Sequence, residues 1–257
     1  MSGAVLSTVE GRAWQASWDR QQEGFMPDRE QRFGAMLDAV EAVAAGLDRP
    51  ARVLDLAGGT GSISLRLLRR LPGAEVTLLD LDPVLLHIAR ATLPAGARIV
   101  VGDLREPDWF RAIPAAGFDA ILTATALHWL AADRLAAVYR DLHRLLARGG
   151  LFVNADHMPD EGLPTLNAAL AGADRARRRA STTAAVSMTW EGWWEHVAAD
   201  PQLGPLKTQR DAIFSIDHAQ EWTPGVTWHL SALRDAGFSE TGILWRAGLD
   251  AAVTGVR

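Results

Sequence analysis

The chain has 257 residues, of which 48% are apolar and 22% are charged, and its net charge is −5. That length can bury one full hydrophobic core with a smaller cap beside it, and the composition is ordinary for a globular protein. The negative balance argues against a nucleic-acid-binding protein, which usually carries a basic surplus. The absence of cysteine excludes disulfides, thiolate metal sites and cysteine nucleophiles.

No apolar run approaches the roughly 20 residues that a membrane-spanning helix needs. The first residues, MSGAVLSTVEGRAW, lack the basic segment and apolar core of a signal peptide. We therefore expect a cytoplasmic protein without membrane or nucleic-acid partners, present as a monomer or a homodimer.

Two helices are expected in the N-terminal region, residues 1–50. Residues 10–24 are polar and amphipathic, with Trp14 and Trp18 about one helical turn apart. In Arg29–Gly46, apolar residues recur at the i, i+3, i+4, i+7 spacing that gives a helix one buried face. The pattern fits helices that pack against a sheet and equally helices that cover a ligand.

Strand and helix patterns then alternate. The predicted strands are nearly continuous apolar runs, as in VTLLD and FDAILTAT, which is typical of strands buried on both faces by crossover helices. We predict strands at 52–56, 75–80, 98–102, 118–124 and 150–155, and helices at 61–71, 83–93, 107–113 and 132–147. The alternation indicates an α/β fold with a parallel sheet, in which ligands bind beyond the carboxyl ends of the strands.

The stretch Val53–Ser64, VLDLAGGTGSIS, is the most informative motif. An apolar strand stops at a turn that contains Gly58, Gly59 and Gly61, and a helix begins after it. Glycine allows positive φ and lets a ligand pack on the backbone, near the free N–H groups of the helix. The turn lacks the Lys of a phosphate loop and the GxGxxG spacing of a dinucleotide site. Asp55 just before the turn suits a ligand ammonium group; a purely structural turn is the alternative.

This motif resembles the first motif of the class I S-adenosylmethionine-dependent methyltransferases. Their pattern (D/E)xGxGxG stands here as Asp55-Leu56-Ala57-Gly58-Gly59-Thr60-Gly61, with Ala57 in place of the first glycine. The resemblance extends from Arg52 to Asp156 and resumes near Leu233. It implies S-adenosylmethionine as cofactor and S-adenosylhomocysteine as product. It also implies a Rossmann-like, mostly parallel seven-stranded sheet of order 3-2-1-4-5-7-6, with the last strand antiparallel.

The resemblance also assigns cofactor-binding positions. Asp80, at the end of the second strand, would accept hydrogen bonds from a ribose diol, while Asp82 is better explained as a helix cap before Pro83. Asp103, at the end of the third strand, would accept from the adenine amino group, although it could simply form a turn. The predicted cofactor-binding residues are Asp55, Ala57, Gly58, Gly59, Gly61, Asp80, Leu81, Asp103, Leu104 and Thr123.

The fourth strand ends in Thr123–Ala126, small residues that leave room for a ligand. Families that methylate base amines or glutamine amides often carry (D/N)PP(Y/F) at this place, and this chain does not. The segment that follows, Leu127–Leu130 (LHWL), resembles small-molecule methyltransferases of the family. We therefore expect a small-molecule acceptor.

Two histidines are candidate general bases. His128 follows the fourth strand and His157 ends the fifth, so both lie at the edge where the ligand is expected. A histidine can take a proton from a hydroxyl nucleophile near neutral pH. His128 could instead stack near the adenine beside Trp129 or make one structural hydrogen bond.

Residues 158–222 interrupt the alternation and predict a helical cap over the substrate. Leu163–Arg179 reads as a helix whose basic end is either solvated or able to steer an anionic substrate. Residues 181–183 read as a loop. The helix Met188–Val197 carries three tryptophans, which pack in a core or line an aromatic pocket. The candidate substrate-binding residues are Trp18, His128, Trp190 and Trp194.

The remaining residues, 223–257, predict the last helix, Val226–Ala236, and a closing hairpin of strands Glu240–Trp245 and Ala251–Arg257. We thus expect a single methyltransferase domain over residues 1–257. Its parts are an N-terminal helical lid at 1–50, a cofactor-binding core at 51–157, the cap at 158–222 and the closing elements at 223–257.

The expected reaction is methyl transfer by in-line displacement to an oxygen, nitrogen or carbon of a small molecule. Such a reaction depends mainly on aligning donor and acceptor and on excluding water, so no unmistakable catalytic residue is required. The chain offers no clustered metal-ligand motif such as HExxH, and no metal is expected. The alternatives are a non-methylating binder of the cofactor, acting as a cyclase or a ligand sensor, and, less favoured, an RNA methyltransferase.

Overall fold

The computed structural model describes residues 6–24, 26, 28–113, 117–183, 188–214 and 221–257. The first five residues of the N-terminal segment, and parts of the 1–50 and 158–222 regions, lie outside the described residues. The elements in chain order are α1 (Thr8–Glu23), α2 (Arg29–Ala44), β1 (Arg52–Leu56), α3 (Ser62–Arg70), β2 (Glu75–Asp80), α4 (Pro83–Thr92), β3 (Arg98–Val101), the 3₁₀ helix η1 (Trp109–Ala112), β4 (Phe118–Ala124), the 3₁₀ helix η2 (Leu127–Trp129), α5 (Ala132–Leu145), β5 (Leu146–His157), α6 (Pro164–Thr183), α7 (Trp190–Ala199), α8 (Gly204–Ile213), α9 (Val226–Asp235), β6 (Glu240–Ala247) and β7 (Asp250–Val256).

The strands form one seven-stranded sheet in the order β3-β2-β1-β4-β5-β7-β6. Neighbouring strands from β3 to β5 run parallel, and β7 is antiparallel to β5 and β6. This order and the antiparallel last strand confirm the predicted fold. Strand β5 begins at Leu146 rather than at residue 150, because Leu146 already pairs with Phe118 of β4; the register then shifts, so that Leu151 pairs with Ala120.

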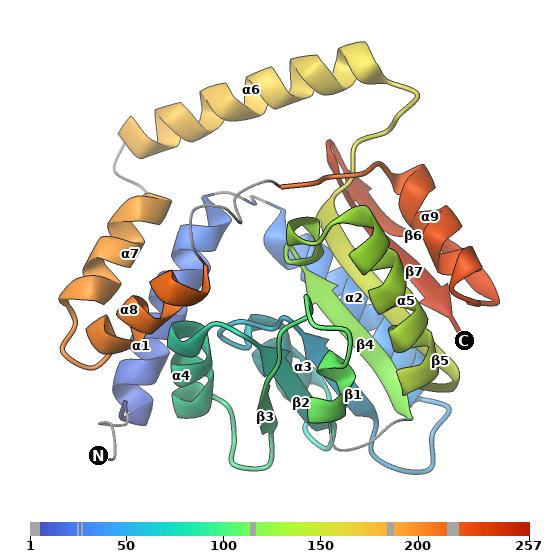
Figure 1. The fold of residues 1–257 in the computed structure, drawn as a ribbon, viewed down its shortest axis with the longest axis horizontal. Helices are drawn as coiled ribbons and strands as arrows, with labels where there is room; N and C mark the ends of the chain where they lie inside the picture. Colours follow the sequence, from blue (N-terminus) through green and yellow to red (C-terminus); the bar gives the residue numbers. More distant parts are fainter. Residues whose placement is uncertain (1–5, 25, 27, 114–116, 184–187, 215–220) are drawn as a thin grey trace.

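Helices cover both faces of the sheet (Figure 1). On one face, Phe33 and Met36 of α2 and Ile63 and Leu67 of α3 share a buried core with the inward side chains of β1, β4 and β5. Each apolar stripe has the spacing that the sequence showed. Helix α2 therefore packs directly against the sheet, with its first turn near the carboxyl ends of the strands.

Helices α5 and α9 cover the other face (Figure 1). Leu135 and Tyr139 of α5 and Leu233 of α9 lie in one core with Phe152 of β5. Helix α9 ends as predicted, because Gly237 takes φ +103° and the N–H groups of residues 237 and 238 bond back to the last turn.

Helices α1, α7 and α8 pack outside α4, beyond the β3 edge (Figure 1). Their shared core contains Trp14 of α1, Val84 and Ile88 of α4, Trp193 of α7 and Leu203. The α1 helix starts with a capping box between Ser7 and Glu10. Parts of the N-terminal and cap regions thus form one body with a conventional apolar core.

Helix α6 runs above the carboxyl ends of the strands, from the end of β5 toward α7 (Figure 1). Within residues 164–177 no side chain is buried. The helix continues through residues 181–183, so the predicted loop there is wrong, and the sequence did not predict α8. Over the part of the chain that the structure describes, no helix has the length and apolar character needed to cross a membrane.

Candidate active site

The glycine-rich turn joins β1 to α3 at the carboxyl edge of the sheet. Ala57, Gly59 and Gly61 have φ of +51°, +56° and +81°. Such values cost an L residue roughly 1–2 kcal/mol, so glycine is favoured at 59 and 61, while Ala57 bears this strain. A Cβ at Gly58 would lie 2.6 Å from Cγ of Asp55. The surface of the turn is therefore formed by backbone atoms, and its shape depends on glycine having no side chain.

Asp55 lies under this turn and is almost fully buried. Its Oδ2 accepts hydrogen bonds from the backbone N–H of Ser64, at 3.0 Å, and from the Ser64 hydroxyl, at 2.6 Å. Its Oδ1 is buried and has no hydrogen-bond partner among the described residues. Burial raises the pKa of Asp55 to about 6. One carboxylate oxygen thus holds the start of α3, and the other keeps its full capacity to accept.

Asp80 ends β2 beside the turn. Its Oδ2 accepts from the N–H of Gly59 at 2.7 Å, and its Oδ1 accepts from the N–H groups of Leu81 and Asp82 at 2.7 and 2.8 Å. Burial, with a smaller contribution from the charge of Asp82, raises the pKa of Asp80 to about 6. Since each carboxylate oxygen has two lone pairs, Oδ2 can accept one further hydrogen bond.

Asp82 caps α4, as predicted: its Oδ1 accepts from the N–H groups of Val84 and Leu85, at 2.9 and 3.2 Å. The sequence did not indicate its second partner. Oδ2 of Asp82 accepts from Nε of Arg210 on α8, at 2.6 Å. An ion pair therefore connects the cap to the residue two positions after Asp80.

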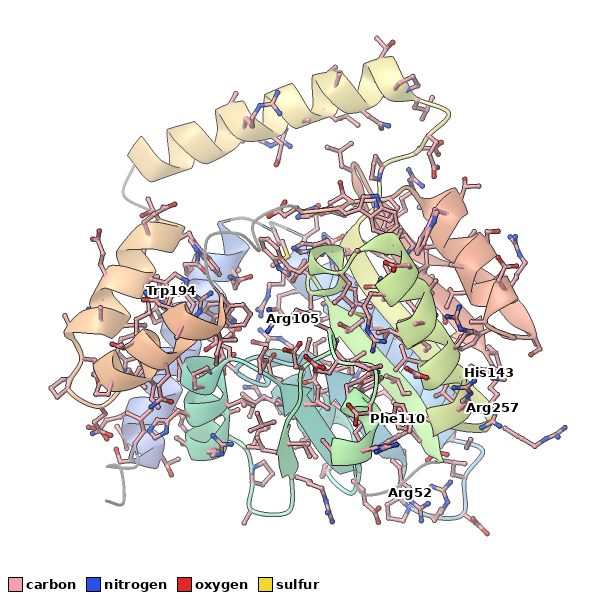
Figure 2. All side chains as sticks on the ribbon, viewed as in Figure 1. Arg52, Arg105, Phe110, His143, Trp194 and Arg257 are labelled. Carbon is pink, nitrogen blue, oxygen red and sulfur yellow. The ribbon has the colours of Figure 1, made fainter. Side chains whose placement is uncertain are left out.

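Asp103 follows β3 at the same edge and is held by Arg105. The Arg105 side chain donates to both carboxylate oxygens at 2.6–3.0 Å, and its backbone N–H donates to Oδ1 at 2.9 Å. Figure 2 labels Arg105 above the strand ends. The turn-forming role that the sequence allowed is thus present. The backbone oxygen of Leu104 accepts from Arg134 at 2.6 Å.

Two threonines mark the end of β4. Thr123 is fully buried, and its hydroxyl has no partner among the described residues. Thr125 takes φ +51°, while its N–H donates to the carbonyl of Ala155 at 2.9 Å. Strained residues of this kind recur at ligand sites, and here the strain turns the chain sharply out of the sheet toward η2.

His128 lies on η2 and is paired with an aspartate that the sequence analysis did not assign. Its Nδ1 lies 2.8 Å from Oδ1 of Asp156 on β5, and both side chains are buried. The pairing holds the pKa of Asp156 below its usual value despite burial. The carbonyl of His128 accepts from the N–H of Trp222. The ring is therefore fixed at one nitrogen, as in a positioned general base.

His157 lies beside His128, with their ring centroids 6.1 Å apart. Its Nδ1 is 2.5 Å from Oδ1 of Asp250 at the start of β7, which raises the pKa of His157. The other oxygen of Asp250 accepts from Arg32 of α2, which is completely buried. Nε of Arg32 has no partner in the described chain. The two imidazoles thus stand in different charge environments.

The sequence missed Arg32 and Asp250 for different reasons. Arg32 lies one turn before Met36 on the apolar stripe of α2, and a charge on such a stripe signals a buried ion pair. Asp250 lies where the sequence predicts a turn between the last two strands, and nothing in the local pattern indicates a site residue there. Asp156 comes directly after a predicted strand, at the edge where the ligand is expected, so its position in the sequence indicates a site residue.

The predicted aromatic residues of the substrate site come together from two distant parts of the chain. Ring centroids of Trp18 and Trp190 are 5.9 Å apart, those of Trp190 and Trp194 are 5.7 Å apart, and those of Trp18 and Trp194 are 6.5 Å apart. Trp190 is 37% exposed, whereas Trp194 is buried. Trp193 faces the core and donates to the hydroxyl of Ser17.

Polar side chains attach α1 to the start of α3. The hydroxyl of Ser62 donates to Asp19 at 2.8 Å and accepts from Gln15 at 2.9 Å. Asp19 also pairs with Arg29 of α2 and Arg66 of α3, and these charges hold its pKa below the usual value despite burial. Helices α1, α2 and α3 are thereby joined next to the glycine turn.

Comparison with known proteins bears on this arrangement. Residues 53–150 match the model of the methyltransferase domain family. The malonyl-[acyl-carrier protein] O-methyltransferase of Halorhodospira halophila is 34% identical over 151 residues, which are 58% of this chain and 48% of that protein. The demethylmenaquinone methyltransferase of Thermus thermophilus is 37% identical over 119 residues, 46% of this chain and 53% of that protein. The chain spans about half the length of the curated relatives it matches.

Among solved structures, PigF with S-adenosylhomocysteine superimposes with a TM-score of 0.52, at 20% identity, over 80% of this chain and 50% of that one. The likeness concerns the fold. The sheet order, the motif at 55–61 and the matched domain agree with one another. Residues 53–150 therefore match the methyltransferase domain family, and the chain has the fold of solved S-adenosylmethionine-dependent methyltransferases.

Proposed function

We propose that this chain binds S-adenosylmethionine at the glycine turn and transfers its methyl group to an oxygen of a small-molecule acceptor. The observation that carries the proposal is the hydrogen bond from Gly59 to Asp80, at 2.7 Å. It brings the glycine turn and the acidic end of β2 together at one edge of the sheet. In an open α/β sheet that edge is where ligands bind.

The residues at this edge fit the cofactor. The unpartnered Oδ1 of Asp55 supports an interaction with an ammonium group, and the remaining acceptor capacity of Asp80 supports a ribose contact. A side chain at position 58 would collide with Asp55, so the cradle is open only because glycine stands there. When bound, S-adenosylmethionine supplies a methyl group already activated by its sulfonium charge. Asp103 and the N–H of Leu104 are proposed to face the adenine.

The histidines support an acceptor that must lose a proton. His128, oriented by Asp156, is proposed to take the proton from a hydroxyl oxygen through its other ring nitrogen, Nε2. His157 beside it, which Asp250 favours in its charged form, is proposed to hold the oxygen as negative charge develops. Trp18, Trp190 and Trp194 would cover an apolar part of the acceptor and exclude water.

Two matched relatives carry names that fit this class: one is an O-methyltransferase of a malonyl carrier and the other a methyltransferase of demethylmenaquinone. The acceptors named there are a malonyl group on an acyl-carrier protein and demethylmenaquinone, and neither is a nucleic acid. Only the first of these names specifies oxygen, and together with the oriented His128 it supports an oxygen as the nucleophile. This is one of the three nucleophile types that in-line displacement permits.

The test is product formation on a panel of acceptors. The purified chain is incubated with S-adenosylmethionine and with short-chain carboxylic acids, phenols, enolic quinols and amines, and S-adenosylhomocysteine is measured by mass spectrometry. We expect turnover with an oxygen acceptor, and a loss of roughly 10²–10⁴-fold in kcat for His128→Asn with unchanged cofactor binding. Absence of cofactor binding by calorimetry would contradict the proposal. Tight binding without product from any acceptor would instead favour a non-methylating binder.

A further inference from the structure

Arg210 of the cap helix α8 contacts an aspartate and two aromatic rings. Its Nε lies 2.6 Å from Oδ2 of Asp82, and its guanidinium lies 3.8 Å from the ring centroid of Trp194 and 5.0 Å from that of Phe214. The side chains of Arg210 and Asp82 are 18% and 5% exposed. Removing one partner from an ion pair this sheltered leaves a buried charge without its partner, which costs more than breaking the usual surface pair.

The partner of Arg210 belongs to the turn that carries Asp80. The N–H of Asp82 donates to Oδ1 of Asp80, and Oδ2 of Asp80 accepts from Gly59 in the glycine turn. The other oxygen of Asp82 caps α4. A continuous series of hydrogen bonds therefore leads from the cap through Asp82 and Asp80 to the backbone surface of the cofactor site.

This link depends on the charges of Asp80, Asp82 and Arg210. Asp80 is half-buried and Asp82 is buried, and removal from water raises the pKa of each carboxyl group. The Arg210 charge opposes that shift at Asp82. Without Arg210, the buried charge of Asp82 would lose the ion pair that compensates it, which is costly. Asp82 would then bind a proton or turn toward water, and its N–H would leave Oδ1 of Asp80.

We propose that Arg210 is a positioning residue of the cofactor site: it holds Asp82, and through it Asp80, in the geometry that receives the ribose. This rests on the proposed function, since it takes Asp80 as a cofactor contact. It goes beyond that function by coupling the cap to the cofactor. By thermodynamic reciprocity, a cofactor that stabilises the turn also stabilises the docking of α8 on α4.

The first test measures the dissociation constant of S-adenosylhomocysteine by calorimetry for the full chain and for Arg210→Met, Arg210→Lys and Lys207→Met. Lys207 is the matched control, because it also lies near Trp194, at 5.8 Å, and pairs with Asp211 rather than Asp82. We expect at least about a fivefold loss for Arg210→Met, the low end of typical coupling between sites, partial recovery in Arg210→Lys, and no change in the control.

Equal affinities in the wild type and Arg210→Met would overturn the proposal, as would Arg210→Lys losing as much as Arg210→Met. A wild type that binds no S-adenosylhomocysteine would refute the proposed function itself, which is a different outcome. The second measurement is chymotrypsin cleavage within residues 188–214, located by mass spectrometry. The ligand, at concentrations that saturate each variant, should slow this cleavage in the wild type and in Lys207→Met but less in Arg210→Lys. Equal protection in Arg210→Lys would contradict the coupling.

Discussion

The two halves of the carboxyl edge are built in different ways. At the cofactor half, the partners are close in the chain: Asp55 bonds Ser64, 9 residues away, and Gly59 bonds Asp80, 21 residues away. At the acceptor half they are distant: His157 and Asp250 are 93 residues apart, and Arg32 and Asp250 are 218 apart. Local motifs can therefore specify the first half, whereas the second half depends on long-range contacts.

The largest expected effect tests whether α7 of the cap belongs to the core that it shares with α1 and α4, beside the cofactor half. Trp193 is fully buried and Trp190 is 37% exposed. Trp193→Ala should lower the free energy of unfolding by about 3–5 kcal/mol, because it removes a large core side chain, whereas Trp190→Ala should cost less than about 1 kcal/mol. Urea denaturation measures both. Equal costs for the two variants would mean that α7 does not pack as described.

The second prediction concerns the cofactor half. Asp80→Ala should weaken binding of S-adenosylhomocysteine by about 1.5–3 kcal/mol, the scale of a lost hydrogen bond to a charged group. Asp133→Ala, an exposed aspartate at the start of α5, serves as control and should leave the affinity unchanged. Calorimetry measures both. Unchanged affinity in Asp80→Ala would move the ribose contact to another residue.

The third prediction uses the two raised pKa values of that half. Asp55 and Asp80, each with a pKa of about 6, have folded-state values above those of the unfolded chain. Their contribution to folding stability is therefore fully present below about pH 4 and is lost as pH rises through about 6. We expect ligand binding to need the ionised forms, so the affinity for ligand should change with pH in the opposite direction to this contribution to stability.

Affinity for S-adenosylhomocysteine should thus fall as pH drops below about 6, by up to about tenfold per pH unit for each carboxylate that must ionise. Calorimetric titrations from about pH 5 to about pH 8 measure this, with Asp80→Asn removing one of the two ionisations. A flat profile in the wild type would show that neither carboxylate must be charged for binding.

The smallest expected effect concerns the pKa of His157, at the acceptor half of the edge. Asp250 raises the pKa of His157, so the His157 ring should titrate above the ordinary histidine value, and Asp250→Asn should lower its pKa. Nitrogen-15 NMR of the imidazoles across the titration measures both. Asp160→Asn, another carboxylate near that end of the sheet, is the control. If the pKa of His157 were unchanged in Asp250→Asn, the proposal that His157 acts in its charged form would lose its support.

The same contrast explains what could be predicted from the sequence. The cap role of Asp82 and the positions of the strand ends follow from local patterns. The sheet order follows from the family resemblance, which a motif within a dozen residues carries. Helix α8 escaped prediction because its stabilising contacts, including Arg210 with Asp82, lie 128 residues apart. Arg32 escaped because its partner lies on the last strand. The composition of residues 181–183 predicts a loop, yet these residues continue helix α6.

The most direct measurement of the central claim is a crystal structure of the chain with S-adenosylhomocysteine. The account predicts the nucleoside against the turn at 57–61, its ribose on Asp80 and its sulfur on the side of the edge where His128 and His157 lie. A nucleoside bound elsewhere, or a sulfur directed away from both histidines, would contradict it.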